Sequence, residues 1–274
     1  MSFSPTRINT GRNLPVATAV GLGLGALLIA SLYFDRWFFV ALISVAGVLA
    51  ITELADTLAH KGIQTSRLHL QISTPILVAL AYYSGLEAVA IAFVIIVILG
   101  LVYRLQNGTD GFVQDGAATT FMLFYVPMLL AFAADLASAD NGFQRVLAIA
   151  VLTSANDTGG YFAGILTGRH PMSKISPKKT WEGFVGSVVL AGVVGTFGVT
   201  ALLDIPRWQG LLVALAVVVT ATVGDFIESA IKRDLGIKDM GSIIPGHGGM
   251  LDRIDSFLIT APIAWFAFVW ILGV

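Results

Sequence analysis

The feature that most constrains this chain is a series of nine apolar stretches that recurs along its whole length. Each stretch is long enough, or nearly so, to cross the hydrocarbon core of a bilayer, which takes about 20 helical residues. We therefore expect an all-α, polytopic integral membrane protein with about nine transmembrane helices. The predicted spans are 14–33, 37–58, 69–85, 87–104, 117–136, 143–167, 183–203, 208–231 and 254–273. The first runs on into further spans without a clear cleavage site, so we interpret it as a retained helix rather than a signal peptide.

The composition supports a membrane protein and narrows the chemistry. Only 12% of the residues are charged, about half of what a soluble domain carries. The net charge of -1 gives no reason to expect a nucleic-acid partner. The absence of cysteine excludes disulfides, thiolate zinc sites and cysteine nucleophiles. The four histidines are scattered, so any metal should be a hard cation held by carboxylates.

The basic residues predict the orientation of the chain. With nine spans, one side of the membrane receives the N-terminus and the loops after spans two, four, six and eight. That side holds all of the 16 lysines and arginines except Arg36, Arg145 and Arg207. Because positive residues are enriched in cytoplasmic loops, we expect the N-terminus and these basic loops, which would carry the active site, to be cytoplasmic.

Polar residues interrupt the predicted span 143–167 in the run from Thr153 to Tyr161. Asn156 and Asp157 lie too far from the ends of this span to reach water. They could simply form hydrogen bonds that link neighbouring helices. A carboxylate is a poor choice for that purpose alone, however, and ionisable groups inside membranes are costly. We favour a functional role for both residues.

A second polar group lies in the span 208–231 and just beyond it. Asp225, Glu228, Ser229 and Lys232 follow one another at helical spacing and share one helix face. Lys232, near the predicted cytoplasmic end, could simply pair with Glu228, whereas Asp225 lies deeper and needs another explanation.

A smaller acidic group lies near the cytoplasmic end of the span 37–58. Glu53 and Asp56 are equally consistent with interfacial charge and with function.

The loop after span six is basic. It contains Arg169, Lys174, Lys178 and Lys179 against the single acid Glu182. Such a loop suits a polyanion, although topological charge and attraction to anionic lipid headgroups are the alternative. Its emergence on the same side as Asp225 favours a site.

The last loop, from Lys232 to Ser256, is dense in charge and glycine. The segment Pro245–Gly249 presents backbone amides in conformations that glycine reaches easily, which suits the binding of phosphate oxygens. Asp252 and Asp255 follow one turn apart at the start of the last span, where Asp252 could act only as a helix cap. Asp225 and Asp252 together could hold a divalent ion among lysines and arginines, as phosphoryl or nucleotidyl transfer requires.

These motifs resemble those of the phosphatidate cytidylyltransferase (CDP-diacylglycerol synthase) family. The family signature falls on Ser229 to Asp255 without departure, and a second family block, S-P-K-K-T-x-E-G, falls on Ser176 to Gly183. The Asn156–Asp157 stretch is also similar. By motif the resemblance covers roughly the last 130 residues, because the N-terminal half matches only in being hydrophobic.

The resemblance implies an enzyme that converts CTP and phosphatidic acid to CDP-diacylglycerol and pyrophosphate in phospholipid biosynthesis. It implies Mg²⁺ at Asp225 and Asp252, the pair that helix geometry also selects. A nearby monovalent cation such as K⁺, a homodimer and a plasma membrane of the bacterial inner-membrane type are implied too.

We divide the expected site into catalytic and substrate-binding residues within a single membrane domain, 1–274. Its helices in 1–140 would be scaffold and its region 141–274 catalytic. The catalytic set is Asp225, Asp252, Lys232, Arg233 and Arg253. The substrate-binding set is Asn156, Asp157, Ser176, Lys178, Lys179, Lys238, Asp239, His247, Gly248, Gly249 and Asp255.

Two other classes of protein are compatible with parts of this pattern. A secondary transporter would use midplane acids and broken helices, which Asp157 and the Gly159–Gly160 pair resemble. The polar residues gather at one membrane face, however, and no inverted repeat is visible. A polyprenol kinase or an alcohol phosphatidyltransferase is the other alternative, and the chain lacks the D-G-x2-A-R-x8-G-x3-D-x3-D pattern of the latter.

Overall fold

The computed structural model describes residues 14–241, 243 and 248–272, and these residues form helices and no strands. The all-α prediction is therefore confirmed for the described part of the chain. An isolated β-bridge joins Pro171 to Thr180. In chain order the helices are α1 (Leu14–Phe34), α2 (Arg36–His60), α3 (Arg67–Arg104), η1 (Leu105–Asn107), α4 (Phe112–Leu123), η2 (Phe124–Met128), α5 (Leu129–Ser138), α6 (Gly142–Thr167), α7 (Trp181–Val193), η3 (Val194–Val199), α8 (Thr200–Leu203), α9 (Arg207–Leu235) and α10 (Leu251–Leu272).

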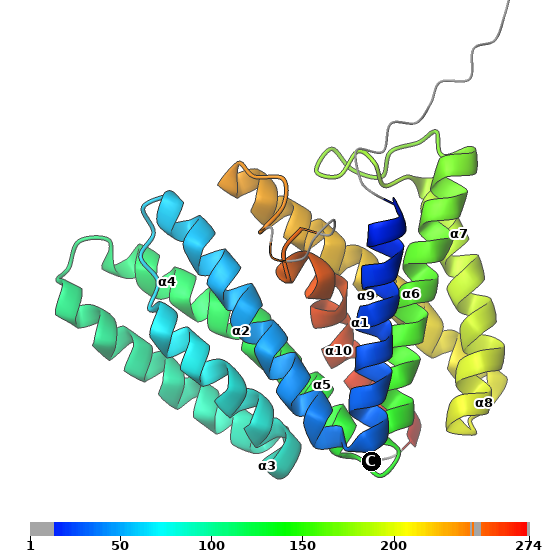
Figure 1. The fold of residues 1–274 in the computed structure, drawn as a ribbon, viewed down its shortest axis with the longest axis horizontal. Helices are drawn as coiled ribbons and strands as arrows, with labels where there is room; N and C mark the ends of the chain where they lie inside the picture. Colours follow the sequence, from blue (N-terminus) through cyan, green and yellow to red (C-terminus); the bar gives the residue numbers. More distant parts are fainter. Residues whose placement is uncertain (1–13, 242, 244–247, 273–274) are drawn as a thin grey trace, which may run out of the picture.

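α3 is a helical hairpin rather than one long helix (Figure 1). Its chain reverses at Gly85, whose φ of 76° is a left-handed value that glycine adopts readily. The two arms run antiparallel, so that His69 Nε2 lies 2.9 Å from the carbonyl oxygen of Ile96. The arms coincide with the predicted spans 69–85 and 87–104, which the sequence separates at this glycine.

Two of the long helices contain a π-helical segment. The π-helix η2, which contains Pro127, joins α4 to α5, and the π-helix η3 joins α7 to α8. Each composite helix, Phe112–Ser138 and Trp181–Leu203, corresponds to one predicted span. The apolar pattern gives no sign of the π-helical turns, because they leave the length and composition of the stretch unchanged.

Six helical segments of the described part of the chain, with the α3 hairpin counted once, are long and apolar enough to cross a membrane. They are Arg36–His60, Arg67–Asn107, Phe112–Ser138, Trp181–Leu203, Arg207–Leu235 and Leu251–Trp270. α6 is long but is not among them, and it carries the polar run that interrupts its predicted span. Within the described residues, each of the nine predicted ranges falls on helix. The count of nine spans and the orientation remain predictions.

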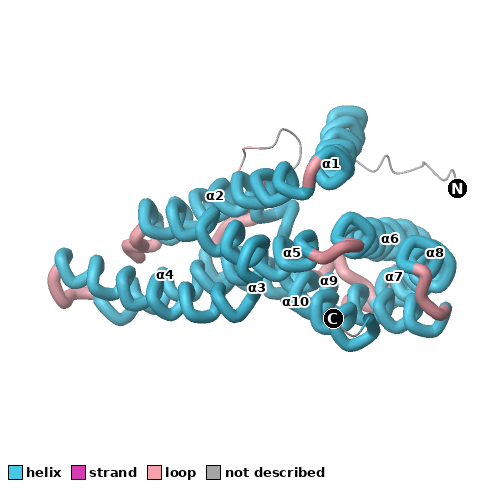
Figure 2. Tube along the Cα trace, turned by 90° about the horizontal axis from the view of Figure 1, so that it is seen from below, coloured by secondary structure: helices cyan, strands magenta, loops and turns pink. Residues whose placement is uncertain are grey.

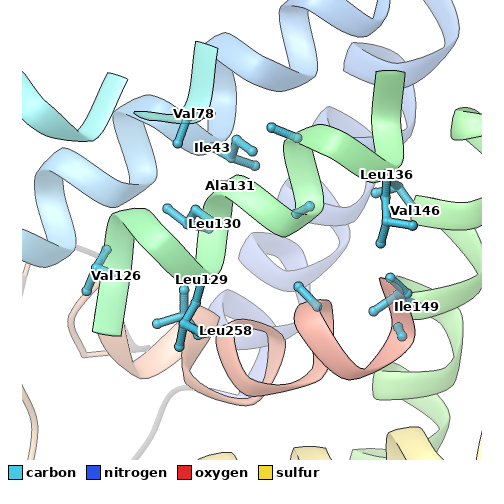
Figure 3. Close-up of a cluster of buried hydrophobic side chains, with 14 of the residues drawn as sticks. Ile43, Val78, Val126, Leu129, Leu130, Ala131, Leu136, Val146, Ile149 and Leu258 are labelled. Atoms are coloured by element: carbon cyan, nitrogen blue, oxygen red, sulfur yellow. The ribbon is translucent and has the colours of Figure 1, made fainter. Parts of the chain in front are cut away.

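α5 forms the centre of the molecule. Seven of its ten residues are buried, on nearly every side of the helix, as expected of a helix enclosed by others. Figure 3 shows side chains of the neighbouring helices gathered around it, among them Ile43 of α2, Val78 of α3, Ile149 of α6 and Leu258 of α10. The outer helices expose large apolar side chains such as Ile95, Val189 and Trp270. An apolar exterior of this kind fits a lipid environment.

Glycines bring the helices of the C-terminal half into close contact. Figure 2 shows α6 and α7 at one end of the molecule, with α5 between them and α3. α6 and α7 cross where a Cβ on Gly186 would lie 2.6 Å from the carbonyl oxygen of Gly159. α9 and α10 meet where a Cβ on Gly224 would lie 2.9 Å from the carbonyl oxygen of Asp255. Small residues permit such approaches between membrane helices, and here they place the polar faces of four helices around one space.

Candidate active site

A polar cavity of about 380 Å³ lies between α6, α9 and α10. Six carboxylates and three cationic side chains line it, an unusual concentration of charge for a chain with so few charged residues. The acidic residues are Asp157, Asp225, Glu228, Asp239, Asp252 and Asp255, and the cations are Lys179, Lys232 and Arg253. Thr153, Ser229, Ser256 and Phe257 complete the lining.

Lys232 joins the end of α9 to the start of α10. Its Nζ donates to Asp252 Oδ1 over 2.9 Å and also pairs with Glu228, one helical turn earlier on α9. The ion pair between Lys232 and Glu228, which the sequence suggests as a simple explanation for Lys232, is therefore present. The same lysine also neutralises Asp252, so the polar face of α9 and the first turn of α10 form one charged group.

Asp225 receives its partners from two other elements. Ser256 Oγ on α10 donates to its Oδ1 over 2.5 Å, and Lys179 pairs with its Oδ2. Lys179 belongs to the basic loop before α7, so this ion pair attaches that loop to α9. Burial lowers the pKa of the Lys179 amine to about 8, although the nearby carboxylates of Asp157 and Asp255 oppose the shift. Lys179 therefore stays predominantly protonated at neutral pH.

Asp252 accepts hydrogen bonds from the described part of the glycine-rich loop between α9 and α10, which we call the glycine loop. Its Oδ2 accepts the backbone N–H of Gly249 over 2.7 Å and that of Met240 over 3.0 Å. Gly248 has a left-handed φ of 84°, and a Cβ there would lie 2.8 Å from the same oxygen. Asp252 thus organises backbone amides, as a cap does, while its other oxygen faces Lys232 and the cavity.

A second cavity, of about 220 Å³, adjoins the first and reaches α7. Asp157, Lys179 and Asp225 line both cavities. Asn156 lies in the second cavity, where its Nδ2 donates to Asp157 Oδ1 over 3.0 Å and its backbone carbonyl accepts from Ser187 Oγ. The remaining lining is Gly160, Tyr161, Met172, Lys178, Thr180, Gly183, Phe184, Ser187 and Thr222. The structure thus brings the polar break in α6 and the basic loop to the aspartates of α9 and α10.

The other predicted site residues lie outside these two cavities. Arg233 and Lys238 are exposed, and Arg233 Nε lies 3.5 Å from the carbonyl oxygen of Ile175 in the basic loop. Ser176 is half-buried, and its carbonyl oxygen accepts the N–H of Lys179. Gly248 and Gly249 pack against Asp252 without lining a cavity. His247 lies outside the described residues.

Two acidic residues at the site are absent from the predicted set. Glu228 lines the first cavity, between α6, α9 and α10, which we call the main cavity. Its helical spacing from Asp225 is visible in the sequence. Glu53 on α2 accepts the backbone N–H groups of Met250 and Leu251 at the start of α10. Its distance in sequence from these partners leaves no local pattern that could reveal the contact. Thr153, Ser229 and Ser256 from α6, α9 and α10, and Tyr161 and Phe184 from α6 and α7, also line the cavities.

The donor atoms of the main cavity suit a hard divalent cation. Carboxylate oxygens predominate, and Glu228 Oε1 is buried without a hydrogen-bond partner among the described residues. Mg²⁺ is usually held by one or two carboxylates, with phosphate oxygens and water completing its coordination. Within the described ranges no three His, Cys, Asp or Glu side chains are grouped as a preformed metal site. Asp225 and Asp252 instead face Lys179 and Lys232.

The described part of the chain is a helical protein of membrane character, with six helices apolar enough to cross a bilayer and a cavity lined by acidic and basic side chains. Residues 15–271 match the model of the Cytidylyltransferase family. The chain belongs to this family.

Known relatives support the assignment over most of the chain. The chain is 37% identical over 273 residues to the phosphatidate cytidylyltransferase of Mycobacterium leprae, covering 93% of this chain and 87% of that one. It is 37% identical to the protein of the same name from Mycobacterium tuberculosis H37Rv, covering 93% of this chain and 82% of that one. The Bacillus subtilis phosphatidate cytidylyltransferase is 36% identical over 185 residues, which is 66% of this chain and 68% of that one.

Proposed function

We propose that this chain is a phosphatidate cytidylyltransferase, which transfers CMP from CTP to phosphatidic acid and releases pyrophosphate. The observation that carries the proposal is the cavity in which the acidic faces of α9 and α10 meet lysines from two separate segments. A triphosphate requires this combination of cations for its charge and carboxylates for a bridging metal. The names of the relatives supply the lipid substrate.

In the reaction, an oxygen of the phosphatidate phosphate attacks the α-phosphorus of CTP. A bond forms between these two atoms, and the bond from the α-phosphorus to the oxygen bridging to the β-phosphorus breaks. That oxygen leaves with the electron pair as part of pyrophosphate. A phosphate monoester is anionic near neutral pH, so a strong general base is not required. Catalysis therefore depends on alignment and on charge neutralisation.

Asp225 and Asp252 are the residues that would hold Mg²⁺. When bound, the ion would neutralise charge on the triphosphate oxygens. Lys179 and Lys232 already pair with these two carboxylates and occupy the positive side of the site. With these carboxylates holding the cation, Lys179 and Lys232 would be free to pair with phosphate oxygens of the triphosphate. The monovalent cation and the homodimer implied by the resemblance remain predictions.

The proposed topology has nine spans, with the N-terminus and the basic loops on the cytoplasmic side of a bacterial-type inner membrane. The C-terminal end of α9, the N-terminal end of α10 and the loop before α7 all contribute to the same polar site, which supports a site near one membrane surface (Figure 1). This position suits the substrates. Phosphatidic acid stays in the bilayer, whereas CTP cannot enter it, so both can meet at the headgroup level.

The direct test is to incubate the purified chain with phosphatidic acid, Mg²⁺ and CTP labelled on either the α- or the γ-phosphate. We expect the α-label to appear in the lipid and the γ-label in pyrophosphate. Transfer of the γ-label to a lipid would instead identify a kinase. Solute flux in proteoliposomes without nucleotide turnover would identify a transporter. Diacylglycerol in place of phosphatidic acid is the matched control, since it lacks the attacking phosphate.

A further inference from the structure

Glu53 is a buried carboxylate that lies outside both cavities yet contacts the glycine loop. It belongs to α2, and only 5% of its surface is exposed. Its Oε1 accepts the N–H of Met250 over 2.8 Å, and its Oε2 accepts the N–H of Leu251 over 3.0 Å. Leu251 is the first residue of α10, whose initial amides have no partner within the helix. A carboxylate at this end of a helix is also favoured by the helix dipole.

Two glycines of the loop enclose this carboxylate. A Cβ on Gly241 would lie 2.6 Å from Glu53 Oε1, and one on Gly249 would lie 2.5 Å from Glu53 Oε2. Neither glycine has a positive φ, so an alanine could adopt the backbone conformation at either position. The contact with Glu53 therefore accounts for the absence of a side chain at both.

The same short segment holds Asp252. Met250 and Leu251, which donate to Glu53, directly precede Asp252, and Gly249 donates its N–H to Asp252 Oδ2. The backbone on the N-terminal side of Asp252 is therefore fixed from two directions. Glu53 holds it from α2, and Asp252 holds it from within α10.

We propose that Glu53 is a positioning residue for nucleotidyl transfer. It fixes the segment Gly249–Leu251 and, through that segment, the orientation of the Asp252 carboxylate. The role in catalysis rests on the proposed function. The two hydrogen bonds by which Glu53 fixes the backbone do not depend on it. Glu53 lines neither cavity, so it would act through the backbone of this segment rather than by direct contact with a ligand.

The hold on the backbone is tested by hydrogen–deuterium exchange of the detergent-solubilised full chain, read by mass spectrometry. In Glu53→Ala we expect the amides of Met250 and Leu251 to exchange at least about tenfold faster, because each loses a hydrogen bond to a charged acceptor. Asp56→Asn is the matched control, since Asp56 lies one turn further along α2, is exposed and pairs with Arg67. Unchanged exchange at both amides in Glu53→Ala would overturn the proposal.

The effect on the site is tested by titrating Mg²⁺ in the transfer assay. In Glu53→Gln, which keeps the size of the side chain, we expect the half-saturating Mg²⁺ concentration to rise about tenfold, as for loss of a residue that orients a metal ligand. A role in folding alone would lower the amount of active enzyme without changing this concentration. The Mg²⁺ requirement of Asp56→Asn should equal that of the wild type.

A double-mutant cycle tests the contact between Glu53 and Gly249. Gly249→Ala should reduce transfer in the wild-type background, because its Cβ meets the carboxylate. The same substitution should have a much smaller additional effect in Glu53→Ala, where that carboxylate is gone. Additive effects of the two substitutions would contradict the proposed contact.

The two proposals can fail separately. A wild-type chain that forms no CDP-diacylglycerol would refute the proposed function, while the exchange experiment would still decide whether Glu53 holds the segment. An active wild type with unchanged exchange and an unchanged Mg²⁺ requirement in the Glu53 variants would refute the positioning role alone.

Discussion

Lys179, in the loop before α7, forms an ion pair with Asp225 in α9, 46 residues further along the chain. A second pair of the same kind joins Lys232 to Asp252. Each aspartate proposed to bind Mg²⁺ thus has a lysine partner. This arrangement pairs each carboxylate with a cation when no ligand is present, and both lysines line the polar cavity.

Loss of the Asp225 carboxylate should abolish most of the transfer activity. We expect Asp225→Asn to lower kcat by about a hundredfold or more, since it would remove a proposed ligand of Mg²⁺, whose charge would stabilise the transition state. Initial rates of CDP-diacylglycerol formation at saturating CTP measure this. Asp204→Asn is the control, because Asp204 is exposed before α9 and its left-handed φ of 54° is tolerated by asparagine. Near-normal Mg²⁺-dependent turnover in Asp225→Asn would disprove the metal assignment.

The basic loop should contribute through one lysine far more than through another. Lys179→Ala should reduce kcat/KM for CTP by about ten- to a hundredfold, the loss expected when a charged partner of phosphate is removed. Lys174→Ala, in the same loop but exposed and outside both cavities, should change it little. Steady-state kinetics with CTP as the varied substrate distinguishes the two. Equal effects would mean that the loop acts only through its overall charge.

Lys232 should matter for stability as well as for activity. Its removal in Lys232→Met leaves Glu228 and Asp252 buried without their cation, a change that typically costs about 3–5 kcal/mol. We expect a clearly lower midpoint of thermal unfolding in detergent. Intrinsic fluorescence measures this midpoint. Lys61→Met, at an exposed position after α2, provides the comparison. A thermal midpoint equal to that of the wild type would show that the charged group adds no net stability.

The crossing of α6 and α7 should tolerate no side chain at Gly186. In Gly186→Ala the new Cβ would lie 2.3 Å from the Ala163 Cβ and 2.6 Å from the Gly159 carbonyl oxygen. Overpacking of this kind costs about 1–3 kcal/mol, and it would also separate the walls of the smaller cavity. Gly192→Ala on the same helix is the control, because its Cβ would meet Leu211 at an ordinary 3.5 Å. Thermal unfolding and transfer assays should show lower stability and lower activity for Gly186→Ala than for Gly192→Ala. Equal stability and activity of the two variants would be inconsistent with the tight crossing.

Much of the helical framework is predictable because apolar length and a few glycines determine it. The stretches 69–85 and 87–104 are separated by Gly85, where the structure reverses the chain. The spacing of Asp225 and Lys232 likewise places both on one helix face, and both line the cavity. These properties are local, so a single sequence contains them.

The rest of the site depends on contacts between distant segments. Glu53 meets Met250 only after α2 and α10 have packed together, and nothing near Glu53 in the sequence specifies that meeting. Arg233 and Lys238 carry the right charge in the right motif, yet both are exposed and outside the cavities. Motif position predicts the neighbourhood of a side chain but not the direction in which it points.

The buried position of α5 has a consequence for the order in which the protein is assembled. The residues with the recognisable motifs are synthesised after α5, and α10 packs against that helix. Glu53 is also in place before Met250 and Leu251 exist. The division near residue 140 therefore separates motif-poor from motif-rich sequence, whereas the packing of α10 on α5 crosses it. We therefore expect the site to be completed only when α10 packs against helices that were synthesised before it.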